Sequence, residues 1–187
     1  MNKSFVLGIK LLLITAVAAL CLSLTNSFTE PIIEEKRQEE LAEAFKEVYA
    51  DAEEFKEIDK SVADSLPENI ISCYQVMKGG NADGYVFEIS APGGYGGDIV
   101  FTLGVNNDME IQGFKSISHQ ESAGFGSKMD EQPFMDGVKG ASMSEEVSAT
   151  EDGAGDNEIA AISGATYSTN AILGGINTIR EAMESLK

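Results

Sequence analysis

The longest uninterrupted apolar segment lies at the N-terminus. Residues 5–28 read FVLGIKLLLITAVAALCLSLTNSF, and Lys10 is the only charged residue among them. A helix that crosses a bilayer needs about 20 predominantly apolar residues, and a lysine near one end can extend its ammonium group to the interface. The pattern therefore predicts a transmembrane anchor over residues 1–29.

A cleaved signal peptide is the alternative for this segment. Such peptides have a shorter apolar run that ends in small residues at the cleavage site, whereas here the run continues into LSLTNSF. Lys3 and Lys10 precede most of the apolar residues, and Glu30, Glu34 and Glu35 follow them. Because cations favour the cytoplasmic side, we expect a single-pass protein of the cell membrane. Its N-terminus would be cytoplasmic, and the rest of the chain would lie on the extracytoplasmic face.

Residues 30–69 form the next expected unit, a stalk helix followed by a connector. Pro31 suits the first turn of a helix, where its missing N–H costs nothing. Residues 32–52 are rich in Glu, Lys and Ala, and their apolar positions keep an approximately helical spacing: Ile33, Leu41, Phe45, Val48 and Ala52. Residues 57–69, which end in Leu-Pro-Glu-Asn, are typical of a connector.

The pattern then changes to short β-rich runs. They are separated by turns rich in glycine and asparagine, and they cover residues 71–77, 85–89, 99–105 and 111–117. Such spacing predicts antiparallel hairpins. The GGYGG run between the second and third leads into a strand and lacks the Lys-Ser/Thr of a phosphate-binding P-loop. We therefore interpret it as a turn.

Two further segments complete the expected domain of residues 70–187. Residues 140–158 are acidic and small, which predicts a mobile surface loop with at most a short strand around Val147. From residue 167 to 186, apolar side chains recur at spacings of four and three, which predicts a helix with one buried stripe: Ile172, Ile176, Ile179, Met183 and Leu186. The sequence thus predicts an α+β fold. A transmembrane helix and a stalk helix precede an antiparallel sheet that is closed by a C-terminal helix.

Composition narrows the possible functions. The formal charge of −18 repels phosphate backbones, which excludes nucleic-acid binding. Cys21 and Cys73 are the only cysteines, too few for a disulfide framework, a Cys-based metal site or an iron–sulfur cluster. His119 is the only histidine, so we expect no metal site.

Hydroxyls and small side chains gather where an apolar run meets the C-terminal helix. Residues 163–169 read SGATYST, in which Gly164 and Ala165 allow another molecule to approach the backbone. The start of a helix offers unpaired N–H groups and a partial positive charge, which suit a phosphate. The hydroxyls at this point belong to Ser163, Thr166, Ser168 and Thr169. An ordinary helix N-cap is the alternative, because Ser and Thr are preferred there.

Ser-Gly-Ala-Thr ahead of a terminal amphipathic helix, in a chain with an N-terminal anchor, resembles the FMN-binding domain shared by two respiratory complexes. These are the Rnf-type ferredoxin:NAD oxidoreductase and the sodium-translocating NADH:quinone oxidoreductase. In that family a flavin transferase joins the phosphate of FMN to the threonine of the motif as a phosphoester. The resemblance therefore implies an antiparallel-sheet FMN-binding domain with a covalent FMN on Thr166.

A second stretch, Ser118–Gly126, supports the resemblance. It reads SHQESAGFG and is similar to the loop that lies beside the flavin in that family. The resemblance implies that Glu121 and Ser122 hydrogen-bond the flavin ring or its ribityl chain. It also implies that Gly124 and Gly126 leave room for the flat ring. A surface turn is the alternative for this stretch.

The similarity extends over nearly the whole chain, because the GYGG run at 94–97 and the TNSFT run at 25–29 also resemble the G subunit of the Rnf-type complex. One feature departs from the family. The transferase recognition pattern usually has an aspartate three or four residues before the serine of the motif, where this chain has Ala160 and Ile159.

The resemblance implies an electron-carrier subunit without a catalytic residue of its own. Its partners would be the other membrane subunits of an ion-translocating oxidoreductase complex, the flavin transferase that matures it and the lipid bilayer. The C subunit of the sodium-translocating quinone reductase is one alternative. A membrane-anchored scaffold without a redox function is the other.

Overall fold

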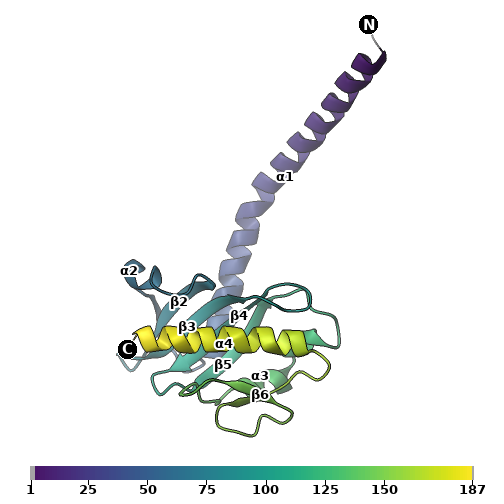
Figure 1. Cartoon of the computed structure of the whole chain (residues 1–187). Helices are drawn as coiled ribbons and strands as arrows, with labels where there is room; N and C mark the ends of the chain where they lie inside the picture. The colour runs from purple at the N-terminus through teal and green to yellow at the C-terminus, as the bar shows by residue number, and fades with distance from the viewer. Residues whose placement is uncertain (1–2, 187) are drawn as a thin grey trace. The chain divides into compact units, whose positions relative to one another are not determined.

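The computed structural model describes the backbone of residues 3–186, and the side chains of residues 6–33 and 36–186 (Figure 1). The chain divides into two compact units, residues 1–41 and residues 42–187.

The chain begins with one long helix, α1 (Lys3–Val48). Large apolar side chains are exposed along its first part, among them Leu11, Leu20 and Phe28. In the described part of the chain, α1 is the one helix that is long and apolar enough to cross a membrane. The side chains of Lys3, Glu34 and Glu35, on which the expected orientation partly rests, lie outside the described set.

Pro31 lies inside α1, so the prediction that it begins a separate stalk helix was wrong. Proline removes one helical hydrogen bond. The longer segments on either side are rich in strong helix formers, Leu and Ala before the proline and Glu, Lys and Ala after it. The helix therefore continues through the proline.

Five antiparallel strands form one sheet in chain order. They are β1 (Glu54–Glu57), β2 (Ile70–Lys78), β3 (Asn81–Ala91), β4 (Ile99–Asn106) and β5 (Ile111–Ser118). The predicted hairpins of β2 to β5 are confirmed. β1 was not predicted, because Phe55 is the only apolar residue among its four. β1 is instead held in the sheet by its pairing with β2, in which Phe55 lies opposite Val76.

One face of the sheet packs against the C-terminal helix, α4 (Thr166–Leu186). On this face Phe87 lies opposite Leu103, and Leu103 lies opposite Phe114. The predicted stripe of α4 is buried against these strands at Ile172, Ile176, Ile179 and Met183. Figure 1 shows α4 lying across the sheet, so the predicted α+β fold with a closing helix is confirmed.

On the opposite face, the end of α1 rests on two glycines. Gly104 of β4 and Gly113 of β5 lie opposite each other in the sheet. A Cβ on Gly104 would lie 2.6 Å from the backbone oxygen of Val48, and one on Gly113 would lie 2.7 Å from its Cα. The hydroxyl of Tyr49 donates a hydrogen bond of 2.7 Å to the Asp83 carboxylate. Residues 42–49 thus belong to the folded domain.

Shorter elements fill the connections. They are α2 (Lys60–Ala63), the 3₁₀ helix η1 (Gly126–Asp130), α3 (Gln132–Val138) and the parallel pair β6 (Ser148–Thr150) and β7 (Glu158–Ala160). The surface loop expected over residues 140–158 is instead anchored in the core by Met143 and Val147. The side chain of Asn177 in α4 binds the backbone N–H and C=O of Val147, at 2.8 and 2.9 Å.

Candidate functional site

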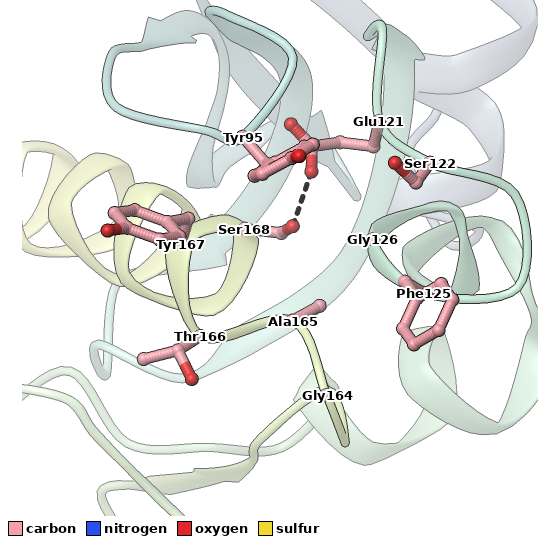
Figure 2. Close-up of a pocket in the computed structure, with 10 residues that line it drawn as sticks. All are labelled: Tyr95, Glu121, Ser122, Phe125, Gly126, Gly164, Ala165, Thr166, Tyr167 and Ser168. Carbon is pink, nitrogen blue, oxygen red and sulfur yellow. Dashed lines mark hydrogen bonds between the residues drawn. The ribbon is translucent and has the colours of Figure 1, made fainter.

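A cavity of about 440 Å³ opens where the β3–β4 turn, the loop between β5 and η1, and the start of α4 meet (Figure 2). Its volume falls in the range of roughly 300–1,000 Å³ that is typical of small-molecule sites. The residues that line it are Tyr95, Glu121, Ser122, Phe125, Gly126, Gly164, Ala165, Thr166, Tyr167 and Ser168.

The turn into α4 is held by Thr169 and by a glycine. The carbonyl of Ala165 accepts the N–H of Thr169 at 3.0 Å, so Ala165 lies at the cap position. The Thr169 hydroxyl accepts the N–H of Ile162 at 3.0 Å and donates to the Ala165 carbonyl at 3.1 Å. Gly164 has a φ of 78°, which favours glycine. The hydroxyl of Thr169 is therefore used within the turn.

Thr166 is the first residue of α4, and its side chain is exposed. Its hydroxyl makes no hydrogen bond to any residue in the described part of the chain, which distinguishes it from Thr169. The N–H groups of a first helical turn have no partner within the helix and carry partial positive charge. The free hydroxyl thus lies at a point that favours an anion.

The Glu121 carboxylate links the three segments around the cavity. Glu121 itself lies in the loop between β5 and η1, and its side chain bonds both the β3–β4 turn and α4. One oxygen accepts the backbone N–H of Gly96 at 2.9 Å. The other accepts the Ser168 hydroxyl of α4 at 2.5 Å, the bond drawn in Figure 2. Because both oxygens have protein donors, Glu121 fixes the β3–β4 turn and α4 at a set separation.

His119 in turn supports the backbone of Glu121. Its Nδ1 accepts the N–H of Glu121 at 3.1 Å, so the proton of the neutral ring is on Nε2. The Nε2–H group donates a hydrogen bond of 2.9 Å to the Asp130 carboxylate. The loop after β5 is thus tied to η1 on one side of the cavity.

Gly126 is packed against the Glu121–Ser168 hydrogen bond. A Cβ at this position would lie 2.4 Å from the Glu121 oxygen and 2.5 Å from the Ser168 hydroxyl. Gly124 has a φ of 76°, and its N–H donates to the Ser127 hydroxyl at 3.0 Å. These glycines allow the loop to come close to α4.

Most of the residues predicted from the sequence come together at the cavity. Those that line it are Glu121, Ser122, Gly126, Gly164, Ala165, Thr166 and Ser168. The other three belong to the turns that shape it: Ser163, Gly124 and Thr169. Ile159 and Ala160, where the family usually has an aspartate, lie in β7, and Ile159 is fully buried.

Three aromatic residues that line the cavity, Tyr95, Phe125 and Tyr167, were not predicted. The sequence offers one signal for two of them, namely the glycines on either side. Tyr95 stands between glycines in the GGYGG run, and Phe125 stands between Gly124 and Gly126. Because glycine has no side chain, an aromatic residue between glycines is covered little by its neighbours in the sequence and is expected to be exposed.

The lining residues fit the parts of an FMN. The flat isoalloxazine ring needs aromatic or apolar walls, which the three aromatic residues supply. The phosphate needs backbone donors and close approach, which the start of α4 and Gly164 supply.

Comparisons with known proteins identify a family for the part of the chain that contains the cavity. The FMN-binding domain family matches residues 94–181, which include all the residues that line the cavity. The G subunit of the Na⁺-translocating ferredoxin:NAD⁺ oxidoreductase complex of Acetobacterium woodii is 31% identical, over 97% of this chain and 92% of that protein. The G subunit of the ion-translocating oxidoreductase complex of Methanosarcina acetivorans is 29% identical, over 91% of this chain and 89% of that protein.

A solved structure shares the fold. It is the crystal structure of the C subunit of the Na⁺-translocating NADH-quinone reductase from Parabacteroides distasonis, with a TM-score of 0.52 and 21% sequence identity. The similarity covers 62% of each chain, so this chain spans somewhat less than two thirds of that structure.

Proposed function

This chain belongs to the family of G subunits of Rnf-type ion-translocating oxidoreductase complexes, and from this premise we propose that it is an electron-carrier subunit with an FMN joined covalently to Thr166. The FMN would supply the redox chemistry, because its ring accepts and releases electrons. The chain itself would hold the ring, orient it and limit its contact with water. By the name of its A. woodii relative, the complex would act between ferredoxin and NAD⁺.

The observation that carries the attachment is the exposed hydroxyl of Thr166 at the start of α4. It lines the cavity, and no described residue competes for it. A phosphoester at this oxygen would lie beside the first N–H groups of α4, which stabilise negative charge. Gly164 lines the cavity just before this point and has no side chain, and a Cβ there would lie 3.2 Å from the Phe125 ring.

The charge of the cavity supports a covalent bond over a dissociable one. Among the described residues that line it, Glu121 is the only one with a charged side chain, and neither lysine nor arginine is present. A free FMN would bring further negative charge to a chain of formal charge −18 without an ion pair to hold it. A phosphoester to Thr166 would hold the cofactor without such a pair.

We also propose how the chain is arranged at the membrane. Residues 1–29 would form a single span with a cytoplasmic N-terminus, and residues 30–41 a stalk. The FMN-binding domain on the extracytoplasmic face would begin at residue 42 and not at residue 70, because β1 and the end of α1 pack with the sheet. The exposed apolar side chains of α1 support the span. Washing membranes with alkaline carbonate should leave the full chain in the pellet. A soluble chain that begins near residues 25–30 would instead indicate a cleaved signal peptide.

The attachment is tested by producing the full chain together with a flavin transferase and denaturing it in SDS. The protein band should show flavin fluorescence, and Thr166→Val should abolish it. Thr178→Val is the matched control, because Thr178 also lies in α4 but its hydroxyl bonds the Gly174 carbonyl away from the cavity. Thr169→Val is a poor control, since it removes two hydrogen bonds of the turn before α4.

The outcomes separate the candidate functions. A fluorescent parent band with a dark Thr166→Val band supports the proposal. A dark parent band in the presence of an active transferase would favour the membrane-anchored scaffold. Fluorescence that survives Thr166→Val would mean that another hydroxyl carries the flavin.

A further inference from the structure

The exposed aromatic residues of the folded domain are concentrated at one cavity. Among the described residues after α1, the large apolar side chains left exposed are Ile71, Tyr95, Phe125 and Tyr167, and the last three line the cavity. Their exposed fractions are 73% for Tyr95, 55% for Phe125 and 66% for Tyr167. Exposed apolar groups that cluster in this way mark a binding site.

The two tyrosines form a pair although they are 72 residues apart in the sequence (167 − 95). Their ring centroids lie 6.4 Å apart, and the ring planes are tilted by 50°. Figure 2 shows the pair on one side of the cavity and Phe125 on the other. The cavity therefore has aromatic groups on two sides.

The hydrogen bonds of Glu121 determine the separation of the tyrosines. Gly96, the residue after Tyr95, donates its N–H to one carboxylate oxygen. Ser168, the residue after Tyr167, donates its hydroxyl to the other. One carboxylate thus holds the residue that follows each tyrosine. A Cβ on Gly96 would lie 1.9 Å from the Gln120 carbonyl oxygen, so the turn that carries Tyr95 is packed closely against this loop.

The tyrosine hydroxyls have no structural use in the fold. Within the described part of the chain, neither the Tyr95 nor the Tyr167 hydroxyl makes a hydrogen bond. Tyr49 and Tyr85, by contrast, bond Asp83 and Gln75 through theirs. The fold therefore gives no reason of its own for two exposed tyrosines at this point.

We propose that Tyr95 and Tyr167 form the aromatic wall against which the isoalloxazine ring packs, with Glu121 as the positioning residue that spaces them. The inference rests on the proposed FMN at Thr166, which immediately precedes Tyr167 in the first turn of α4. Contacts between aromatic rings contribute stabilising free energy in addition to that gained by burying apolar surface. The ring would cover the two side chains that folding leaves exposed.

Flavin fluorescence tests this contact directly. A phenol ring in contact with an excited isoalloxazine donates an electron to it, and the electron returns without emission of light. The chain has no tryptophan and five tyrosines, so tyrosine is the only side chain here that quenches strongly in this way. Quenching therefore reports which tyrosines touch the ring.

The experiment compares flavin-loaded full-length variants in detergent. Tyr95→Phe, Tyr167→Phe and the double variant keep the aromatic wall but remove the phenols. Tyr85→Phe is the control, because Tyr85 lies in β3 and bonds Gln75 outside the cavity. Emission and its lifetime are measured in the native state and again after denaturation, and emission is expressed per covalently bound flavin.

The native emission of the double variant should rise several-fold over that of the parent, and Tyr85→Phe should match the parent. Glu121→Gln, which weakens the bonds that space the pair, should give a smaller rise. Native emission of a loaded double variant that equals the parent's would overturn the tyrosine wall and leave the proposed function intact. A parent chain without bound flavin would overturn the proposed function itself.

Discussion

At the scale of single residues, hydroxyl groups a few residues apart have different surroundings. Thr169 uses its hydroxyl in the turn before α4, and the Ser168 hydroxyl donates a hydrogen bond to the Glu121 carboxylate. Thr166, between Ala165 and Tyr167, is exposed and has no partner among the described residues. A transferase that meets this surface would therefore find Thr166 available and its two neighbours in α4 already engaged.

Gly126 tests how closely the loop and α4 must approach. Gly126→Ala would put a methyl group within 2.5 Å of the Glu121–Ser168 bond, so one of the two side chains would have to move. Such overpacking costs about 1–3 kcal/mol. We expect a lower melting temperature and less covalent flavin per chain, both measured in detergent.

Gly137→Ala is the matched control for this change. Gly137 lies in the short helix α3 with open space around it, so an added methyl group meets nothing within 4 Å. Alanine in a helix is more favourable than glycine by roughly 0.5–1 kcal/mol. Equal stability and flavin content of the two variants would show that the Gly126 contact is unimportant.

At the scale of elements, the helices and strands that could be predicted are those whose own sequence shows a periodic or continuous apolar pattern. The strands from β2 to β5 carry continuous β-rich runs, and α4 carries a stripe of isoleucines, so both could be predicted. β1 has one apolar residue and forms only because β2 offers an edge. β6 and β7 pair in parallel across an acidic segment, and no hairpin turn signals such a pairing.

The candidate site was predictable in one part only. Its motif residues are contiguous in the sequence, as in 163–169, and a resemblance can identify them. Tyr95 comes from a turn 26 residues before Glu121 (121 − 95), and only the folded sheet brings it beside Tyr167. No local sequence pattern predicts that the β3–β4 turn, the loop between β5 and η1 and the start of α4 meet at one cavity.

The docking of α1 on the sheet depends on the glycines beneath Val48. Gly113→Ala would put a methyl group 2.7 Å from the Val48 backbone, which cannot move without displacing the end of α1. We expect a loss of about 1–3 kcal/mol in the free energy of unfolding. Denaturant unfolding in detergent measures it.

Gly174→Ala provides the comparison for that loss. Gly174 lies on the exposed side of α4, and a methyl group there meets nothing within 4 Å. This variant should be as stable as the parent or slightly more stable. If Gly113→Ala unfolds at the same denaturant concentration as Gly174→Ala, the end of α1 does not depend on this contact.

At the scale of the whole molecule, two buried acids should make the fold sensitive to alkali. Burial raises the pKa of the Cys73 thiol from its ordinary value of 9.0 to about 12. Burial, and then the hydrogen bond to Asp83, raise the pKa of Tyr49 above its ordinary value. Both groups lie outside the apolar segment of α1, in the folded domain.

Because these pKa values are raised, the unfolded chain loses protons at a lower pH than the folded chain does. The stability that these two groups contribute is therefore fully present below about pH 9 and is lost as the pH rises from about 9 towards 12, by up to about 1.4 kcal/mol per pH unit for Cys73 alone. Cys73→Val should flatten the decline of the unfolding free energy between pH 9 and 11. An equally steep decline in that variant would exclude Cys73 as its source.

The attachment of FMN to Thr166 is tested most directly by mass spectrometry of the chain after production with a flavin transferase. Trypsin cleaves after Lys139 and Arg180, so residues 140–180 form one peptide that contains every hydroxyl of the SGATYST segment. The account predicts that this peptide gains the mass of FMN less one water, and that fragmentation assigns the gain to Thr166. An unmodified peptide, or a gain on Ser163, Ser168 or Thr169, would contradict it.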